Sequence, residues 1–179
     1  DFHLLDSAGL YLRVARVLDT LEQLETSHGN LYNWYATDTL EVLPDGFVSA
    51  VDSGNLLCAL VTLREGLLEY ATGEPMLLDA AQRIQRLLDA ADLSVFYHPQ
   101  RRLFSIGLDQ KGRQSSYHYD FLMSEARALS YYAIATRQVP LRHWRSLNRS
   151  MGHSGRKTGL LSWTGTMFEY LMPHLFLPV

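Results

Sequence analysis

The feature that most constrains the fold of this chain is an alternation of amphipathic and almost wholly apolar segments at helical spacing. Residues 4–25 and 75–91 each combine an apolar stripe with a charged face, whereas residues 53–70 and 118–138 are apolar nearly all round. A helix with one apolar stripe covers a core from outside, and a helix apolar on every side is enclosed by neighbours. The alternation therefore predicts an all-α fold with two concentric helix layers, an (α/α) toroid rather than a four-helix bundle.

Local signals define the expected boundaries of these elements. The stripe of the first segment consists of Leu10, Val14, Val17, Leu21 and Leu24. Asp52 or Ser53 is expected to cap the second helix, and Pro75 to open the third. Two β-type runs around Pro99 predict a small hairpin within residues 95–112. Residues 143–148 suggest a short turn of helix, and residues 151–159 a glycine-rich loop.

The length of the chain suggests that the toroid is incomplete. The 179 residues, 47% of them hydrophobic, suffice for one core, and no linker divides them, so residues 1–179 are expected to form a single domain. A closed toroid of about a dozen helices, each of about 11 residues plus connections, needs roughly twice this chain. We therefore expect a fragment of a much larger protein. No run approaches the ~20 apolar residues that span a bilayer, so this segment itself is expected to be soluble.

The single cysteine and the histidines indicate neither a disulfide nor a metal site. Cys58 lies in the apolar run "NLLCALVTL" and is expected to pack as a small core residue. None of the seven histidines forms a His-x-x-x-His pair or stands beside the cysteine at metal-ligand spacing. We expect no metal and no cofactor.

Four stretches carry the residue types of a sugar site: "YNWYATD", "VDSGN", "YHYDFLMSEAR" and "WTGTMFEY". Aromatic faces stack on the C–H surfaces of sugar rings, while carboxylates and amides bind hydroxyl groups. Cleavage of a glycosidic bond adds a pair of carboxyl groups. Each aromatic could instead be a core residue, and Asp52 and Asp120 could simply cap helices.

Glu125 is the first candidate for a catalytic carboxyl. At helical spacing it shares a stripe with Phe121, Leu129 and Tyr132, and burial there would favour its neutral form, as a general acid requires. The alternative is a structural ion pair with an arginine such as Arg127. Glu169 is the second candidate, because it also lies in a strongly apolar segment and could face the same cavity.

A rival function is suggested by the charge distribution. Between Glu125 and Glu169 there is no acidic residue, whereas Arg127, Arg137, Arg142, Arg145, Arg149, Arg156 and Lys157 all lie there. The stretch from Arg127 to Lys157 could bind a polyanion with strongly salt-dependent affinity. A non-catalytic helical scaffold is the third possibility.

Five ordered motifs resemble one known family. "HGNLYNWYATDTLEVLP", "FVSAVDSGNLLCALVTLREGL", "RRLFSIG", "YDFLMSEARALSYYAIATRQVPLRHW" and "LLSWTGTMFEYLMPHL" resemble, in this order, the glycoamylase-like region of cyclic β-1,2-glucan synthases. The resemblance implies an (α/α) toroid that cuts linear β-1,2-glucan and rejoins it into a ring by transglycosylation. It also implies a place in a large protein at the cytoplasmic side of the bacterial inner membrane. The implied partners are this glucan and the other domains of the synthase, with no nucleic acid.

The resemblance also assigns residues. It implies catalytic roles for Glu125 and Glu169, and the candidate substrate-binding residues are Trp34, Tyr35, Asp52, Asn55, Tyr119, Asp120, Trp163 and Thr164. The family pattern continues beyond "FEYLMP" with a further acidic motif, whose glutamate is a candidate partner for Glu125. The apolar end of the chain would be exposed unless covered, so we expect copies to associate through it.

Overall fold

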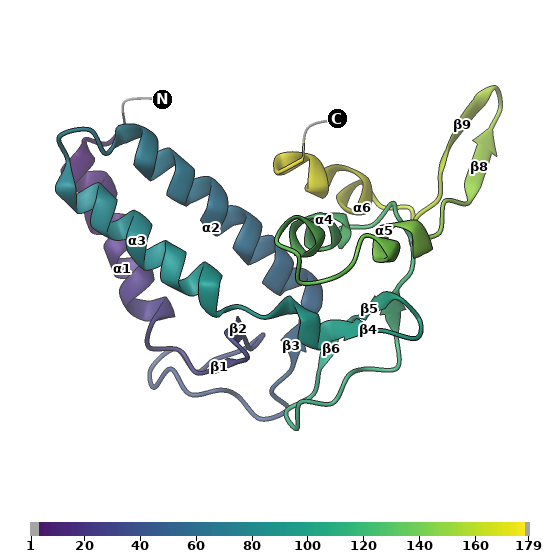
Figure 1. Cartoon of the computed structure of the whole chain (residues 1–179), viewed down its shortest axis with the longest axis horizontal. Coiled ribbons are helices and arrows are strands. Elements are labelled where there is room, and N and C mark those ends of the chain that lie inside the picture. The colour runs from purple at the N-terminus through teal and green to yellow at the C-terminus, as the bar shows by residue number, and fades with distance from the viewer. Residues whose placement is uncertain (1–3, 178–179) are drawn as a thin grey trace.

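Three long helices form one side of the computed structural model, which describes residues 4–177 (Figure 1). They are α1 (Ser7–Leu21), α2 (Ala50–Tyr70) and α3 (Pro75–Ala90). Helix α3 packs against both α1 and α2, and α2 continues across the molecule to pack against α4 (Arg127–Ala135). The shorter helices α5 (Arg142–Ser146) and α6 (Met167–Leu171), with the 3-10 turn η2 (Met172–Leu175), complete the other side.

The ends of the long helices follow ordinary capping chemistry. The Asp6 carboxylate accepts a hydrogen bond from the Gly9 amide at 2.7 Å and starts α1. Pro75 begins α3, as predicted. The prediction that Asp52 or Ser53 caps α2 was wrong: the cap is Ser49, whose hydroxyl accepts from the Asp52 amide at 3.2 Å. Helix α2 therefore starts three residues earlier than predicted, which places Asp52 inside its first turn.

The core confirms the periodicity argument for most positions. Leu77, Ala80, Ala81, Ile84 and Leu88 form the buried face of α3, and Cys58 is a buried core residue as expected. In α1 the buried positions are Val14 and Leu18, whereas Val17, assigned to the stripe, is 56% exposed. The predicted positions Leu10, Val14 and Leu21 all pack on the core, and Leu18 takes the place assigned to Val17.

Small antiparallel sheets connect the two sides. The predicted hairpin is confirmed as β4 (Tyr97–His98) and β5 (Leu103–Ser105), with β7 (His118–Tyr119) paired to the other edge of β5. Strand β3 (Val48–Ser49) pairs with β6 (Gly107–Leu108), and β1 (Thr26–Ser27) with β2 (Asn30–Leu31). The turn η1 (Leu93–Phe96) leads from α3 into β4.

Residues 118–126 do not form a helix, contrary to the prediction for residues 118–138. The segment starts with β7, and its following residues bond to the chain after α5: the Asn148 amide donates to the Asp120 carbonyl, and the Leu122 amide to the Asn148 carbonyl. Pairing with distant strands thus replaces local helix bonds, and only α4 keeps the predicted conformation.

The expected glycine-rich loop at residues 151–159 is instead a β-hairpin. Strand β8 (Met151–Ser154) pairs with β9 (Lys157–Leu160), and Gly155 has a φ of 61° at the turn. The hairpin extends away from the helices (Figure 1).

A buried histidine joins three elements beneath the hairpin sheet. His143 of α5 donates from Nδ1 to the Arg102 carbonyl and accepts at Nε2 from the Ser130 hydroxyl of α4, both at 2.9 Å. Its ring also contacts the edges of Tyr97 and Phe104. Burial lowers the pKa of His143, so the neutral ring is the form built into this side of the core.

Candidate active site

Glu125 lies in the turn that leads into α4. Its side chain is half-buried, and Oε2 accepts a hydrogen bond from the Ser124 hydroxyl at 3.2 Å. Within residues 4–177 no ion pair joins Glu125 to Arg127, whose guanidinium instead contacts Met123 Sδ and His174 Nε2. The ion pair of Glu125 with Arg127, the structural alternative to a catalytic role, is therefore absent from the described residues.

Tyr119 connects two of the predicted carboxylates. The residue ends β7 and is buried. Burial raises the pKa of its phenol, and the negative charges of Glu125 and Asp52 raise it further. The charges of both carboxylates thus act on the phenol of Tyr119, although Asp52 and Glu125 belong to separate motifs.

A glycine in α2 allows α2 and α4 to approach each other closely. A Cβ added at Gly54 would lie 2.5 Å from Cβ of Leu129 in α4, closer than real side chains come. Because Gly54 has no side chain, the first turns of α2 pack directly on α4. The motif "VDSGN" therefore supplies the glycine through which the start of α2 approaches α4, while its Asp52 is exposed.

Trp163 forms an aromatic wall on one side of the carboxylates. Its ring stacks on Tyr119 with centroids 5.5 Å apart and planes at 17°. The indole N–H donates to Asp120 Oδ1 at 2.6 Å, so Asp120 fixes the edge of the ring and is not a helix cap. Trp163 remains 46% exposed, which leaves surface for stacking with a ligand.

Trp34 lines a cavity on the side of Asp52. This cavity of about 440 Å³ lies between the loop after β2 and the start of α2, and Asn33, Ser53 and Leu56 contribute to its walls. Trp34 is 72% exposed. One exposed indole, Trp34, thus lies in the cavity of Asp52, and a second, Trp163, lies against Tyr119.

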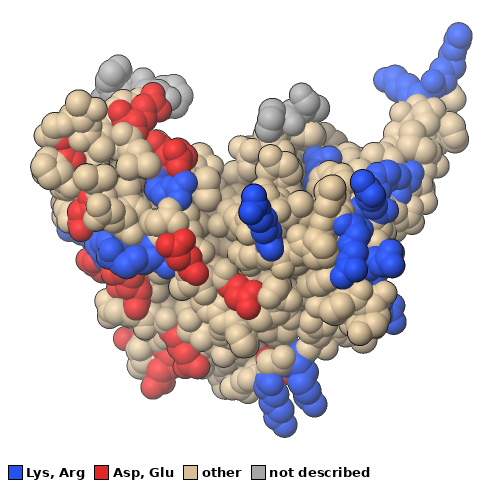
Figure 2. Space-filling model, in the orientation of Figure 1, with Lys and Arg blue, Asp and Glu red and all other residues tan. Residues whose placement is uncertain are grey.

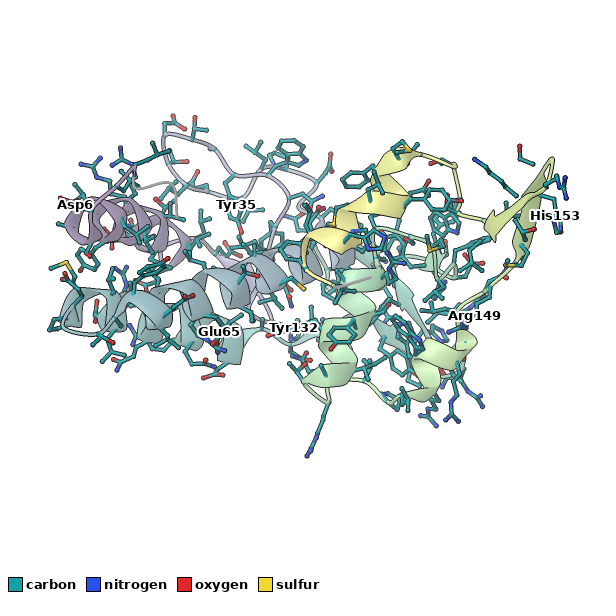
Figure 3. All side chains as sticks on the ribbon, turned by 90° about the horizontal axis from the view of Figure 1, so that it is seen from above. Asp6, Tyr35, Glu65, Tyr132, Arg149 and His153 are labelled. Carbon is teal, nitrogen blue, oxygen red and sulfur yellow. The ribbon has the colours of Figure 1, made fainter. Side chains whose placement is uncertain are left out.

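The structure gives Tyr35 contacts within its own loop and leaves the side-chain oxygen of Asn55 without one. The Tyr35 hydroxyl donates to the Glu25 carbonyl at 2.7 Å and accepts from the Tyr32 amide at 2.8 Å, so it ties the loop together (Figure 3). Asn55 is half-buried in α2, and its Oδ1 is enclosed with no hydrogen-bond partner among the residues described.

Glu169 is saturated with hydrogen bonds from its own loop. It is 6% exposed and accepts from the Ser162, Thr164 and Thr166 hydroxyls and from the Thr164 and Thr166 amides, at 2.7 to 3.2 Å. Burial opposes ionisation of Glu169, but these donors outweigh it and lower the pKa to about 2. No described contact joins Glu169 to Glu125.

The sequence signal for this arrangement is the spacing Thr166-x-x-Glu169. Thr166 and Glu169 form a capping box at the start of α6, in which each side chain bonds the other residue's backbone amide. This pattern was readable in the motif "TMFE" and was missed. The remaining donors, Ser162 and Thr164, come from the turn that carries Trp163.

The basic stretch from Arg127 to Lys157 extends over α4, α5 and the β8–β9 hairpin. Figure 2 shows Lys and Arg side chains on this part of the molecule, including the tip of the hairpin. Arg149 donates to the carbonyls of Leu147 and Trp144, so it stabilises the chain after α5. The polyanion hypothesis stays a prediction.

The described residues contain neither a candidate metal site nor a candidate membrane-spanning helix. Within them, no group of three His, Cys, Asp or Glu side chains is placed to hold a metal ion. In the same residues, no helix combines the length and apolar character needed to cross a bilayer.

Comparison with known proteins gives two informative similarities. The chain is 36% identical over 128 residues to the cyclic β-(1,2)-glucan synthase NdvB of Rhizobium meliloti (strain 1021), a match that covers 69% of this chain and 4% of that protein. A crystal structure of a glucoamylase-like protein from Bacteroides caccae superposes with a TM-score of 0.79 at 19% identity, over 98% of this chain and 46% of the other. No protein-family model matches the chain.

The structural similarity concerns the fold alone, and it supports the helical, toroid-type architecture predicted from the alternating segments. The chain spans only a small part of its curated relative. It is thus similar in sequence to a segment of a cyclic β-(1,2)-glucan synthase and in fold to a glucoamylase-like protein, which confirms the resemblance drawn from its five motifs.

Proposed function

We propose that this chain forms a glucan-processing site that cleaves and re-forms β-1,2-glucosidic bonds. The observation that carries the proposal is the position of Tyr119: its ring stacks on Trp163, and the charges of Glu125 and Asp52 both raise the pKa of its phenol. Two carboxyl groups beside aromatic platforms are the parts that glycosidic chemistry requires. The similarity to a cyclic β-(1,2)-glucan synthase supports this choice of sugar.

The proposed reaction is a double displacement with retained configuration. One carboxylate attacks the anomeric carbon as the bond to the leaving oxygen breaks, and a carboxyl group donates its proton to that oxygen. A sugar hydroxyl then attacks the anomeric carbon, the ester bond to the carboxylate breaks, and the hydroxyl proton returns to the second group. When the hydroxyl belongs to the far end of the same chain, the product is a ring. Trp163 and Trp34 would hold the sugars on either side.

We propose Glu125 and Asp52 as the pair that performs these steps, and a positioning role for Glu169. Glu169 uses its oxygens to bind five donors and is ionised far below neutral pH, so it neither donates a proton readily nor offers a free lone pair. Holding the loop of Trp163 is the role that its contacts support. We further propose that residues 1–179 work as one domain of a larger polypeptide.

The test compares two carboxyl variants with a matched control, all made in the natural full-length protein that contains this chain. Glu125→Gln and Asp52→Asn should each lower the rate of glucan cleavage and ring formation by roughly 10² to 10⁴, while glucan binding persists. Glu69→Gln, an exposed carboxyl at the far end of α2, should leave the rate unchanged. Full activity of Glu125→Gln would refute the proposal.

A further inference from the structure

We propose that a second glucan-binding site lies between α2, α3 and α4, away from Glu125. A cavity of about 560 Å³ opens there, within the range of small-molecule sites. Its lining includes Arg64 of α2, about 12 residues beyond Asp52, which corresponds to roughly 18 Å along a helix. None of its lining residues also lines the cavity of Trp34 and Asp52, so the two cavities are separate. The choice of glucan as its ligand rests on the proposed function.

Two consecutive tyrosines of α4 provide the aromatic part of this cavity. Tyr131 is 53% exposed, and Tyr132 is half-buried on the side of α4 that faces α2 (Figure 3). Among the described residues, neither phenol hydroxyl has a hydrogen-bond partner. An exposed ring with a free hydroxyl can stack on one sugar face and bond to a neighbouring hydroxyl group.

A polar network connects the other two helices. Gln85 of α3 donates from Nε2 to Asp89 Oδ1 at 2.7 Å and accepts a hydrogen bond from the guanidinium of Arg64. Arg64 also pairs with its neighbour Glu65. The donors and acceptors along this wall are thus held in place before any ligand arrives, which reduces the cost of ordering them.

The charge of the network favours a neutral ligand. The positive charge of Arg64 is matched by Glu65, and Asp89 adds a negative charge within the same cavity. A phosphate or another anion would meet no excess positive charge there. A polyhydroxylated sugar chain instead matches the mixture of hydroxyl, amide and carboxylate groups.

The remaining wall is rigid and partly apolar. Gln138 accepts at Oε1 from the Leu93 amide and donates from Nε2 to the Ala91 carbonyl, so its side chain is fixed between the end of α4 and the end of α3. Leu88 and Ala135 line the cavity beside it. Such surfaces suit the C–H faces of pyranose rings. A long glucan could contact this site and the region of Glu125 at the same time, and a short one only one of them.

The experiment measures glucan affinity as a function of chain length in the natural protein. By calorimetry with linear β-1,2-glucans, Tyr131→Ala should weaken the binding of long chains about fivefold and leave the binding of di- and trisaccharides at the Glu125 site unchanged. Tyr132→Phe removes only a hydroxyl and should act in the same direction without disturbing the core. Tyr117→Ala, which removes a tyrosine that is 71% exposed and lines neither cavity, is the matched control.

The outcomes separate this proposal from the proposed function. Unchanged long-chain affinity in both tyrosine variants, together with inactive Glu125→Gln, would overturn the second site alone. Cleavage that survives Glu125→Gln, with length-dependent binding that requires Tyr131, would overturn only the catalytic assignment. A natural protein that binds no glucan of any length would overturn both.

Discussion

Trp163 is held at three points, and each holds a different part of the residue. Tyr119 covers one face of the indole, Asp120 binds its N–H, and Glu169 fixes the loop on either side of it. An aromatic platform contributes most to binding when its orientation is fixed before the ligand arrives. We therefore assign Asp120 and Glu169 to positioning Trp163.

Removal of the Asp120 carboxylate tests this at a single hydrogen bond. Asp120→Ala should free the indole edge and weaken glucan binding by roughly tenfold, the range expected for a hydrogen bond to a charged group. KM should rise more than kcat falls, because the reacting groups are untouched. Trp163→Phe keeps the stacking on Tyr119 but lacks the N–H, so Asp120→Ala should have no added effect in that background. Additive losses would contradict the pairing.

Glu169 should contribute a measurable acid sensitivity to stability. Its pKa is lowered from 4.5 to about 2 in the folded protein. Between these two pH values, folding therefore releases a proton from the Glu169 carboxyl. The stabilisation is complete above pH 4.5 and is lost as the pH falls from 4.5 towards 2. Urea unfolding at several pH values should show this loss, and Glu169→Gln should reduce stability at neutral pH by about 1–3 kcal/mol. An identical acid dependence in Glu169→Gln would contradict the assignment.

At the scale of the elements, the periodic segments were predictable and the paired segments were not. Helices α1 and α3 follow from spacing because each buries a stripe defined by its own sequence, and α2 follows from a segment that is apolar nearly all round. Residues 118–126 have comparable apolar spacing, yet their conformation depends on β5 and on Asn148, which lie far away in sequence. Because residues 118–126 are not helical, Glu125 does not share a helical stripe with Leu129 and Tyr132 as predicted. The position of Glu125 beside Tyr119 comes from the turn before α4.

The contact between α2 and α4 offers a test with an internal control. Gly54→Ala places a methyl group 2.5 Å from Cβ of Leu129, so α2 must shift, and we expect destabilisation by about 1–3 kcal/mol and reduced activity. Gly66→Ala lies in the same helix with no atom within 4 Å of the new methyl group, and should stabilise by about 0.4–1 kcal/mol. Thermal unfolding of both variants checks the pair. Equal effects would argue against a close helix contact.

At the scale of the whole molecule, the alternation of segments indicated the architecture, but the meeting of the site residues could not be deduced from it. Asp52, Tyr119 and Trp163 belong to three motifs with similar mixtures of aromatic and polar residues. Only packing through Gly54 and the pairing of β7 with β5 brings them together. The same motifs also contain Tyr35, which bonds to its own loop. Composition identifies the set of candidates, and tertiary contacts select among them.

The C-terminal apolar face leads to the last prediction. Met167, Phe168, Leu171 and Leu175 are all more than half exposed on α6 and η2. Exposed apolar side chains grouped on one face favour association, and burying each contributes roughly 1.5–3 kcal/mol. In sedimentation velocity, the chain of residues 1–179 should self-associate with rising concentration, and Phe168→Gln with Leu171→Gln should weaken this more than tenfold. The matched pair Leu12→Gln with Val17→Gln, which alters exposed positions of α1, should leave association unchanged. An equal effect of both pairs would mean that copies do not associate through α6.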